Sequence, residues 1–293
     1  LAWLGERATV VLAPADSDEF ASCCARAEGL VVRTYTRVDA ALLDRMPRLR
    51  AVGRAGVGLD NVDAEACAAR GVAVLNTPDA NTPAVVEFVL AGMLDATRPR
   101  GYLDRALDPE AWNALRADMV APRQLAGSTL GVWGLGRIGA RIARAGAALG
   151  MEVLYHDLRE VPEAEREGAR PVPREELLAR SDFLTVHVDG RPSNRGLIAR
   201  AEFALMKPDV VFINTSRGFV VDPEACADFM RARPEAKAML DVHEPEPIPV
   251  EHPLLMMPNV HLTPHIASAT LAAKEAMSWV VRGVWEALAA QPV

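Results

Sequence analysis

Short apolar segments rich in β-branched residues alternate with helical patterns along nearly the whole chain, and this alternation constrains the fold most. We expect strands at residues 9–13, 30–33, 49–52 and 72–76, and again at 130–133, 153–156, 183–187, 210–214, 238–242 and 260–263. Helical patterns separate most of these segments, for example at residues 63–70 and 137–149. Because parallel strands require crossover helices, the alternation predicts an α/β protein with parallel sheets.

Three further stretches suggest how the chain is divided. Residues 83–97 predict a long helix, with Thr82 as its N-cap and Pro99 as its stop signal. Residues 100–127 are polar and are expected to be irregular, whereas residues 270–289 are expected to form one helix. A length of 293 residues corresponds to about two domains.

The composition excludes several classes of protein. A net charge of −7 argues against nucleic acid as a partner, and no apolar run is long enough to cross a membrane. The first residues lack the basic region of a signal peptide. The chain also begins without Met, so we expect further residues upstream. Its four cysteines lack the spacing of a metal site, which predicts free buried thiols in a reducing cytoplasm and no metal; they are Cys23, Cys24, Cys67 and Cys226.

A glycine-rich turn in the second half has the context of a dinucleotide-binding motif. Gly134, Gly136 and Gly139 follow an apolar strand and open a helical pattern, and Asp157 ends the next strand, 18 residues past Gly139. Glycine at these positions permits a tight turn, a close approach of pyrophosphate and close helix packing. The helix N-terminus at Arg137 and Ile138 offers its N–H groups to phosphates. Asp157 can accept both ribose hydroxyl hydrogens and would repel a 2′-phosphate, which favours NAD over NADP. The alternative is a plain glycine turn.

A second glycine-rich segment, residues 53–58, follows a predicted strand but has its glycines in a different order. We interpret it as a loop whose exposed backbone N–H groups can hold a carboxylate. An ordinary turn capped by Asp60 or Asn61 explains the spacing equally well.

Three chemically suitable residues follow three late strands. Arg217, Glu246 and His265 come after the strands expected near residues 210–214, 238–242 and 260–263. The carboxyl ends of parallel strands share one edge of a sheet, where ligands bind. Hydride transfer at a carbon that bears oxygen requires an acid/base and a cation for the substrate carboxylate, which these residues can supply. Taken singly, residues of these types at such positions are more often surface charges or solvated loop residues.

Taken together, these motifs resemble the D-isomer-specific 2-hydroxyacid dehydrogenase family over nearly the whole chain, and the phosphoglycerate dehydrogenase-like branch in particular. The resemblance implies that His265 is the general acid/base, that Glu246 favours its protonated form, and that Arg217 binds the substrate carboxylate. It also implies two further groups of site residues. Val188, Thr215 and Asp241 would contact NAD, and the substrate would lie beside Arg54, Ala55, Gly56, Val57, Gly58 and Asn81.

The same resemblance implies an architecture. A Rossmann NAD-binding domain, residues 95–266, would be inserted in a discontinuous flavodoxin-like substrate domain, residues 1–94 plus 267–293. The active site would lie in the cleft, and the protein would be a cytoplasmic homodimer joined through the cofactor domain. The predicted activity is NAD-dependent hydride transfer to or from C2 of a small D-2-hydroxy or 2-oxo acid, such as 3-phosphoglycerate, hydroxypyruvate or glyoxylate.

Two departures from the family pattern qualify this picture. Asp189 and Gly190 stand where the family usually has a proline and an apolar residue, and this adds a charge beside the expected cofactor. The family's first, central strand is missing before Thr9. A different function also fits the sequence, since a non-enzymatic NAD-sensing protein of the corepressor kind retains the same motifs.

Overall fold

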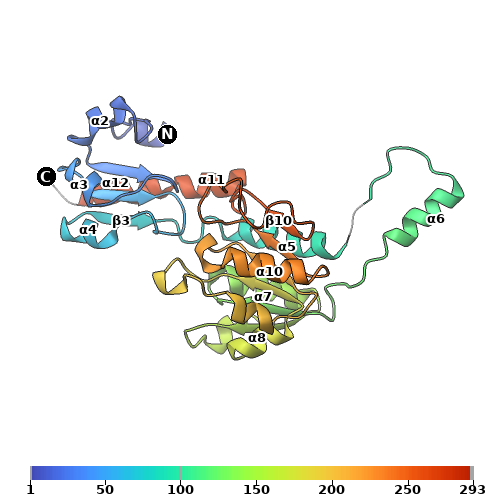
Figure 1. Cartoon of the computed structure of the whole chain (residues 1–293). Helices are drawn as coiled ribbons and strands as arrows, with labels where there is room; N and C mark the ends of the chain where they lie inside the picture. Colours follow the sequence, from blue (N-terminus) through green and yellow to red (C-terminus); the bar gives the residue numbers. More distant parts are fainter. Residues whose placement is uncertain (1, 99–100, 291–293) are drawn as a thin grey trace. The chain divides into compact units, whose positions relative to one another are not determined.

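A computed structural model describes residues 2–98 and 101–290, which form two compact units (Figure 1). Unit 1 comprises Leu1–Asn81 and Ala269–Val293, and unit 2 comprises Thr82–Ser268. The predicted division differs from this one mainly in helix α5 (Thr82–Thr97), which belongs to unit 2. The reason is that α5 packs on the helix and the strand of unit 2 at Arg137–Ala148 and Val211–Asn214.

Unit 1 is built around a parallel three-stranded sheet in the order β1-β2-β3. Helix α12 from the second segment of the unit packs against all three strands, so both segments belong to one compact unit. The elements of unit 1 are α1 (Ala2–Gly5), α2 (Asp18–Cys24), β1 (Gly29–Val32), α3 (Ala40–Asp44), β2 (Ala51–Arg54), α4 (Ala64–Ala69), β3 (Ala73–Asn76), α11 (Leu271–Ser278) and α12 (Val280–Ala290).

Local sequence explains where these elements begin and how they pack. Asp39 and Asp63 accept backbone N–H hydrogen bonds at the N-termini of α3 and α4. Gly53 in β2 faces α12 so closely that a Cβ there would lie 2.6 Å from a methyl group of Val284. The absence of a side chain at Gly53 therefore sets the close approach of helix and sheet.

Two predictions for unit 1 are wrong. Residues 9–13 form no strand, because they pair with no other strand in the described chain, and Leu12 is 69% exposed. Residues 270–289 form two helices rather than one. At the break, the N–H of Arg282 donates to the carbonyl of Trp279 three residues back, and the Arg282 guanidinium lies 3.9 Å from the Trp279 ring centroid.

Unit 2 contains a parallel seven-stranded sheet in the order β10-β9-β8-β7-β4-β5-β6. Its strands are β4 (Thr129–Trp133), β5 (Glu152–His156), β6 (Arg170–Pro171), β7 (Phe183–Val186), β8 (Val211–Asn214), β9 (Lys237–Leu240) and β10 (Val260–Leu262). Its helices are α5, α6 (Pro109–Asp118), α7 (Arg137–Ala148), α8 (Arg174–Arg180), α9 (Arg200–Leu205), α10 (Pro223–Ala232) and the short 3₁₀ turns Glu163–Glu165, Pro192–Asn194 and Gly218–Val220. The order of strands reverses between β7 and β4, which is where ligands bind in such sheets.

Helices cover both faces of this sheet, and each face has its own core. Helices α5 and α7 pack over one face, where Val89 and Ile142 contact the strands. Helices α8, α9 and α10 pack over the other, through Leu177, Phe203 and Phe229. Because the central strands are buried on both sides, they appear in the sequence as continuous apolar runs. The predicted parallel α/β architecture is confirmed.

Three details of unit 2 differ from the sequence prediction. Residues 100–127 contain α6, whose N-terminus has Asp108 as cap and Pro109 in its first turn. Thr82 lies inside α5, and its buried hydroxyl has no hydrogen-bond partner among the described residues, so it is not the N-cap. Strand β6 is only two residues long and contains a proline, so its sequence carries no strand pattern.

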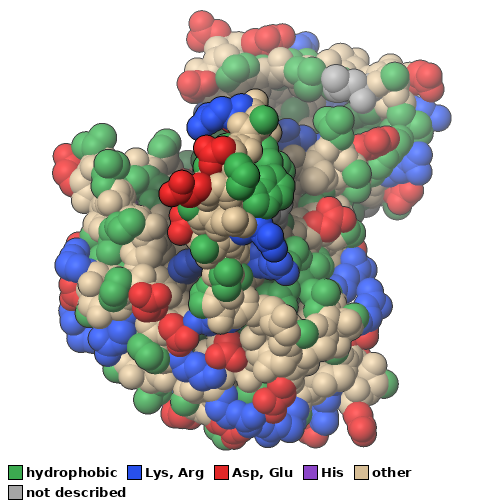
Figure 2. All heavy atoms as spheres, turned by 90° about the vertical axis from the view of Figure 1, so that its right-hand side faces the viewer, with side chains coloured by type: hydrophobic (Ala, Val, Ile, Leu, Met, Phe, Trp, Pro, Cys, Tyr) green, Lys and Arg blue, Asp and Glu red, His purple; other side chains and the backbone are tan. Residues whose placement is uncertain are grey.

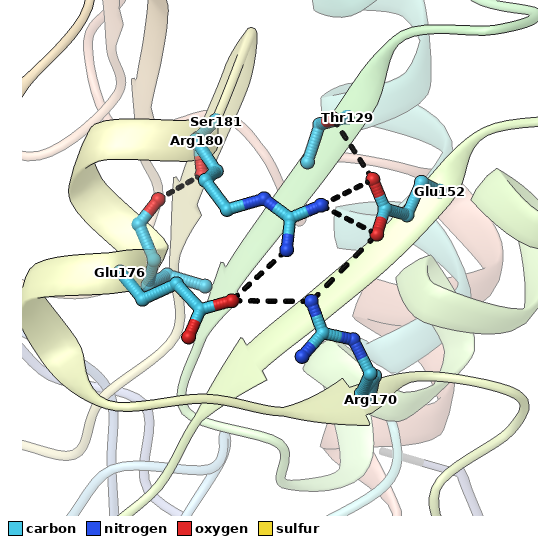
Figure 3. A network of polar contacts seen from close by, with 7 residues as sticks. Thr129, Glu152, Arg170, Glu176, Arg180 and Ser181 are labelled. Atoms are coloured by element: carbon cyan, nitrogen blue, oxygen red, sulfur yellow. Dashed lines mark hydrogen bonds and ion pairs between the residues drawn. The ribbon is translucent and has the colours of Figure 1, made fainter.

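Many charged side chains lie on the surface of the protein. On the face shown in Figure 2, basic and acidic side chains lie interspersed. Figure 3 shows one such network, in which Glu152 on β5 and Glu176 on α8 each pair with Arg170 and Arg180. These side chains are 36–50% exposed, so solvent screens the network and it contributes little to stability.

Cys24, Cys67 and Cys226 are buried free thiols, and burial raises the pKa of Cys226 to about 12. Cys23 is partly exposed, and for this residue the prediction of a buried thiol is wrong, because it lies on the outer side of α2 beside Arg26.

Candidate functional site

The turn between β4 and α7 has the geometry that the glycine pattern predicts. Gly134 has a φ of +96°, and a Cβ there would lie 2.7 Å from the carbonyl oxygen of His187. A Cβ on Gly139 would collide with the carbonyl oxygen of Gly134. Two of the three glycines are therefore needed for the turn itself.

Gly136 has a different role, because no atom lies within 4 Å of the position its Cβ would take. It is the N-cap of α7, and it provides no side-chain hydrogen bond to the helix N-terminus. Open space beside uncapped N–H groups suits a phosphate group.

Asp157 follows β5, as predicted, and contacts the turn directly. Its Oδ2 accepts the N–H of Leu135 at 2.7 Å, and its Oδ1 accepts the N–H of Arg159 at 2.9 Å. The carboxylate is therefore held at the end of its strand beside the glycine turn, where it can also accept ribose hydroxyl groups. Thr215 adds a hydroxyl that is buried without a hydrogen-bond partner in the described chain. Together, these residues fit a dinucleotide.

The segment after β7 carries the unusual Asp189. Its carboxylate accepts hydrogen bonds from the Arg191 side chain at 2.7 and 2.5 Å and from Asn194 at 3.1 Å. The Arg191 guanidinium is the main reason why the pKa of Asp189 lies below its usual range. The extra charge beside Val188 is thus compensated within its own loop.

Arg217 follows β8, and a buried asparagine shapes its turn. Asn214 Nδ2 donates to the carbonyl of Arg217 at 2.9 Å, and Asn214 Oδ1 accepts from the N–H and hydroxyl of Ser216 at 3.0 and 2.7 Å. Arg217 is partly buried, and its guanidinium donates to the carbonyl of Ser216 at 2.7 Å. Asn214, which forms this turn, is not among the site residues predicted from the sequence.

Glu246 and His265 form a hydrogen-bonded pair. Glu246 Oε2 lies 2.9 Å from His265 Nδ1. A carboxylate accepts, so Nδ1 carries the hydrogen and Nε2 remains for a substrate. The side chains of His265 and Glu246 are 36% and 22% exposed, so the pair can be reached from solvent.

Asp241 anchors the segment that carries His265. This buried carboxylate accepts the Thr263 hydroxyl at 2.6 Å and the N–H groups of Ile266 and Ala267, both at 2.8 Å. His265 lies between these anchors with a φ of +55°, a conformation that non-glycine residues rarely adopt. The predicted contact of Asp241 with the nicotinamide carboxamide stays a prediction.

Seen along the sheet, the candidate residues of unit 2 follow the carboxyl ends of neighbouring strands. The order of strands places Asp157, the glycine turn, Val188, Arg217, Glu246 and His265 after β5, β4, β7, β8, β9 and β10. These strands are parallel, so the residues gather along one edge.

The loop after β2 in unit 1 is only partly available for a ligand. The N–H groups of Ala55 and Gly56 already donate to the carbonyls of Val32 and Arg54, both at 2.9 Å. Those of Val57 and Gly58 donate to no acceptor in the part of the chain described, so they are the ones that can hold a carboxylate.

Two side chains of unit 1, those of Arg54 and Asn81, are also among the predicted substrate-binding residues. The Arg54 side chain packs over Gly56 so closely that a Cβ on Gly56 would collide with the guanidinium, and Gly56 has a φ of +148°. The Asn81 carbonyl oxygen is buried without a hydrogen-bond partner among the described residues. It is therefore suited to a substrate hydroxyl.

A cavity of about 250 Å³ lies beside the segments that follow β8 and β9, and no glycine of the β4–α7 turn lines it. It is lined by Arg195, Gly218, His243 and His252 together with apolar residues such as Leu254. Because it contains neither Arg217 nor His265, we do not assign it to the reacting groups.

Two other kinds of site are absent from residues 2–98 and 101–290. This part of the chain has no cluster of three or more His, Cys, Asp or Glu side chains able to hold a metal ion. Its helices include none with the length and apolar character to cross a membrane.

Comparison with known proteins identifies the family. A family model described as "D-isomer specific 2-hydroxyacid dehydrogenase, NAD binding domain" matches residues 90–267. D-3-phosphoglycerate dehydrogenase of Archaeoglobus fulgidus is 40% identical over 248 residues, 84% of this chain and 46% of that protein. Glyoxylate reductase of Aeropyrum pernix is 40% identical over 249 residues, 83% of this chain and 74% of that protein.

A solved structure agrees with these matches. D-lactate dehydrogenase from Aquifex aeolicus, complexed with NAD and lactic acid, has a TM-score of 0.77 at 28% identity, covering 93% of this chain and 90% of that one. The chain spans about half the length of the archaeal phosphoglycerate dehydrogenase, since the match covers 46% of it. The predicted Rossmann fold and NAD as cofactor are confirmed. The chain belongs to the D-isomer specific 2-hydroxyacid dehydrogenase family.

Proposed function

We propose that the protein is an NAD-dependent oxidoreductase that transfers a hydride between nicotinamide and C2 of a small D-2-hydroxy or 2-oxo acid. The observation that carries this proposal is the 2.9 Å hydrogen bond between Glu246 and His265. The pair follows β9 and β10 in the same sheet whose β4–α7 turn fits a dinucleotide.

His265 supplies or removes the proton at the substrate oxygen. NADH, when bound, supplies the hydride for reduction of a 2-oxo acid. In that direction Nε2 of protonated His265 donates its proton to the C2 oxygen as C2 gains the hydride, and the products are a 2-hydroxy acid and NAD⁺. In oxidation, neutral Nε2 accepts the hydroxyl proton. Glu246 stabilises the protonated imidazole, because its negative charge lies at Nδ1.

Arg217 is proposed to bind the substrate carboxylate and to polarise the C2 carbonyl. A guanidinium matches a carboxylate with paired donors, and the Asn214 turn fixes the backbone from which Arg217 projects. In unit 1, the N–H groups of Val57 and Gly58 and the Asn81 side chain are proposed as substrate-binding groups.

Among the 2-hydroxy and 2-oxo acids that suit this chemistry, we propose 3-phosphoglycerate, hydroxypyruvate, glyoxylate or a similar acid as the substrate. Similar proteins carry the names phosphoglycerate dehydrogenase and glyoxylate reductase, which supports small acids of two or three carbons. Arg54, whose side chain packs over Gly56, is a cation in unit 1 suited to a phosphate.

The test is to measure NADH oxidation with a panel of 2-oxo acids that includes glyoxylate, hydroxypyruvate and 3-phosphohydroxypyruvate. We predict turnover with at least one acid and a kcat at least ~100-fold lower for His265→Ala, the usual scale for lost acid/base catalysis. His261→Ala, an exposed histidine on the adjoining strand β10, is the control and should keep its activity. Near-normal turnover of His265→Ala would refute the assignment.

Failure of wild-type protein to turn over any acid, with NAD binding intact, would favour the non-enzymatic NAD-sensing alternative. The homodimer and the cytoplasmic location also stay predictions of the family resemblance.

A further inference from the structure

We propose that His243 is a positioning residue that fixes Glu246 relative to His265. The inference rests on the proposed function, since it concerns the same acid/base pair. His243 comes three residues before Glu246 on the segment that follows β9, and its imidazole reaches the segment that follows β10. It therefore joins the two segments on which the pair depends.

The main chain of His243 holds the carboxylate. Its N–H donates to Glu246 Oε1 at 3.0 Å, while Glu246 Oε2 receives His265 Nδ1 at 2.9 Å. Each carboxylate oxygen is thus assigned to one donor, and the plane of the carboxylate is fixed by both.

The side chain of His243 holds the other segment. Its Nε2 lies 2.8 Å from the carbonyl oxygen of Thr263, and that same oxygen accepts the N–H of His265 at 3.0 Å. A carbonyl only accepts, so Nε2 of His243 must carry a hydrogen. One residue is therefore bonded to Glu246 through its main chain and to the backbone beside His265 through its ring.

Contacts with Gly218 and His252 hold His243 in position. Its backbone packs so tightly against Gly218 that a Cβ on Gly218 would collide with the His243 carbonyl group. Its ring meets the ring of His252 edge to face, with centroids 6.4 Å apart, along the wall of the 250 Å³ cavity. An apolar side chain could fill the same space, but it could not donate to Thr263.

The experiment compares two replacements of His243 in the full chain. His243→Leu removes the donor, whereas His243→Gln keeps an N–H donor at nearly the reach of Nε2. We expect His243→Leu to lower kcat about tenfold, the effect of one hydrogen bond that positions a reacting group, and His243→Gln to restore most of it. The KM for NADH should stay within about twofold, because the dinucleotide turn is untouched. His252→Leu, the neighbouring ring in the cavity, serves as the matched control.

The decisive readout is the pH profile of kcat for reduction. A loosened Glu246 stabilises the protonated His265 less, so in His243→Leu the fall of activity toward high pH should begin at lower pH. Glu246→Gln, which removes the negative charge itself, should shift the profile in the same direction. A purely structural role would lower the active fraction, measured by NADH binding, without moving the profile. An unmoved profile, or a His243→Gln variant as impaired as His243→Leu, would overturn the inference.

The two proposals fail in different ways. If wild-type protein turns over no 2-oxo acid, the proposed function fails. The ionisation of the His265 imidazole, followed by NMR in wild type and in both His243 variants, needs no turnover and still tests the positioning. If wild type is active and these titrations coincide, only the role of His243 fails.

Discussion

His187 shows how one residue can serve the cofactor turn and respond to pH. Its carbonyl oxygen faces Gly134, and its ring nitrogen Nε2 lies 2.8 Å from the hydroxyl of buried Thr185. The residue keeps some exposed surface, yet its ring is desolvated by the packed end of β7, which lowers the pKa of His187 to about 3. The folded protein therefore needs this histidine neutral.

This pKa predicts a loss of stability in mild acid. The unfolded chain binds a proton at His187 near pH 6.5, whereas the folded chain resists it down to about pH 3. The contribution of His187 is therefore present above pH 6.5 and lost as pH falls from 6.5 toward 3. The free energy of unfolding, measured by urea denaturation between pH 7 and 5, should depend less on pH in His187→Gln than in wild type. Parallel curves for the two proteins would contradict the prediction.

The site residues that could be predicted are those whose position directly after a strand is evident from the neighbouring sequence. The glycine turn, Asp157, Arg217, Glu246 and His265 all follow recognisable strands, so their common edge could be inferred from the parallel topology. Asn214 and His243 could not be predicted in this way. The partner of the His243 ring is the Thr263 carbonyl, twenty residues further along the chain. Because every residue has a backbone carbonyl, the sequence does not indicate which one accepts this hydrogen bond.

At the scale of elements, the hydrophobic pattern of the sequence predicted the strands that are buried on both faces. It failed for residues 9–13 and for α6, which are not buried in this way. The buried strands β4, β7 and β8 are continuous apolar runs, and each was located to within about two residues. Residues 9–13 have the composition of a strand but no neighbour to pair with, and composition alone cannot supply one. Helix α6 was missed because none of its residues is buried, so it has no apolar stripe facing a core.

The contact between α12 and β2 gives a prediction at the same scale. Gly53→Val would place a side chain against Val284, because a methyl group of Val284 lies only 2.6 Å from the point that a Cβ on residue 53 would occupy. We expect a loss of about 1–3 kcal/mol in the free energy of unfolding, because an overpacked core must shift. Adding Val284→Ala should recover part of the loss, and thermal unfolding of the single and double variants measures this. Equal stability of Gly53→Val and wild type would show that the helix can move away freely.

For the whole molecule, α6 is the element to test for the predicted homodimer. No residue of α6 is buried, Trp112 is 45% exposed, and Tyr102 and Val120, which flank the helix, are 85% and 75% exposed. Apolar side chains of this size are costly to leave in water.

We predict that Trp112→Glu shifts a dimer toward monomer, as measured by light scattering after size-exclusion chromatography. Asn113→Glu introduces the same charge at the next position of α6 and is the control. Unit 2 should keep its NAD binding in both variants, because α6 lies outside the dinucleotide turn. A Trp112→Glu protein of unchanged mass would exclude α6 from the interface.

The discontinuity of unit 1 has a consequence for how the protein is made. A ribosome releases β1, β2 and β3 early, but α12, which covers their sheet, emerges only after the whole of unit 2. Unit 2 is continuous in sequence and can fold during synthesis as soon as its last strand is free. Until α12 has been synthesised, the three early strands lack the helix that covers one face of their sheet.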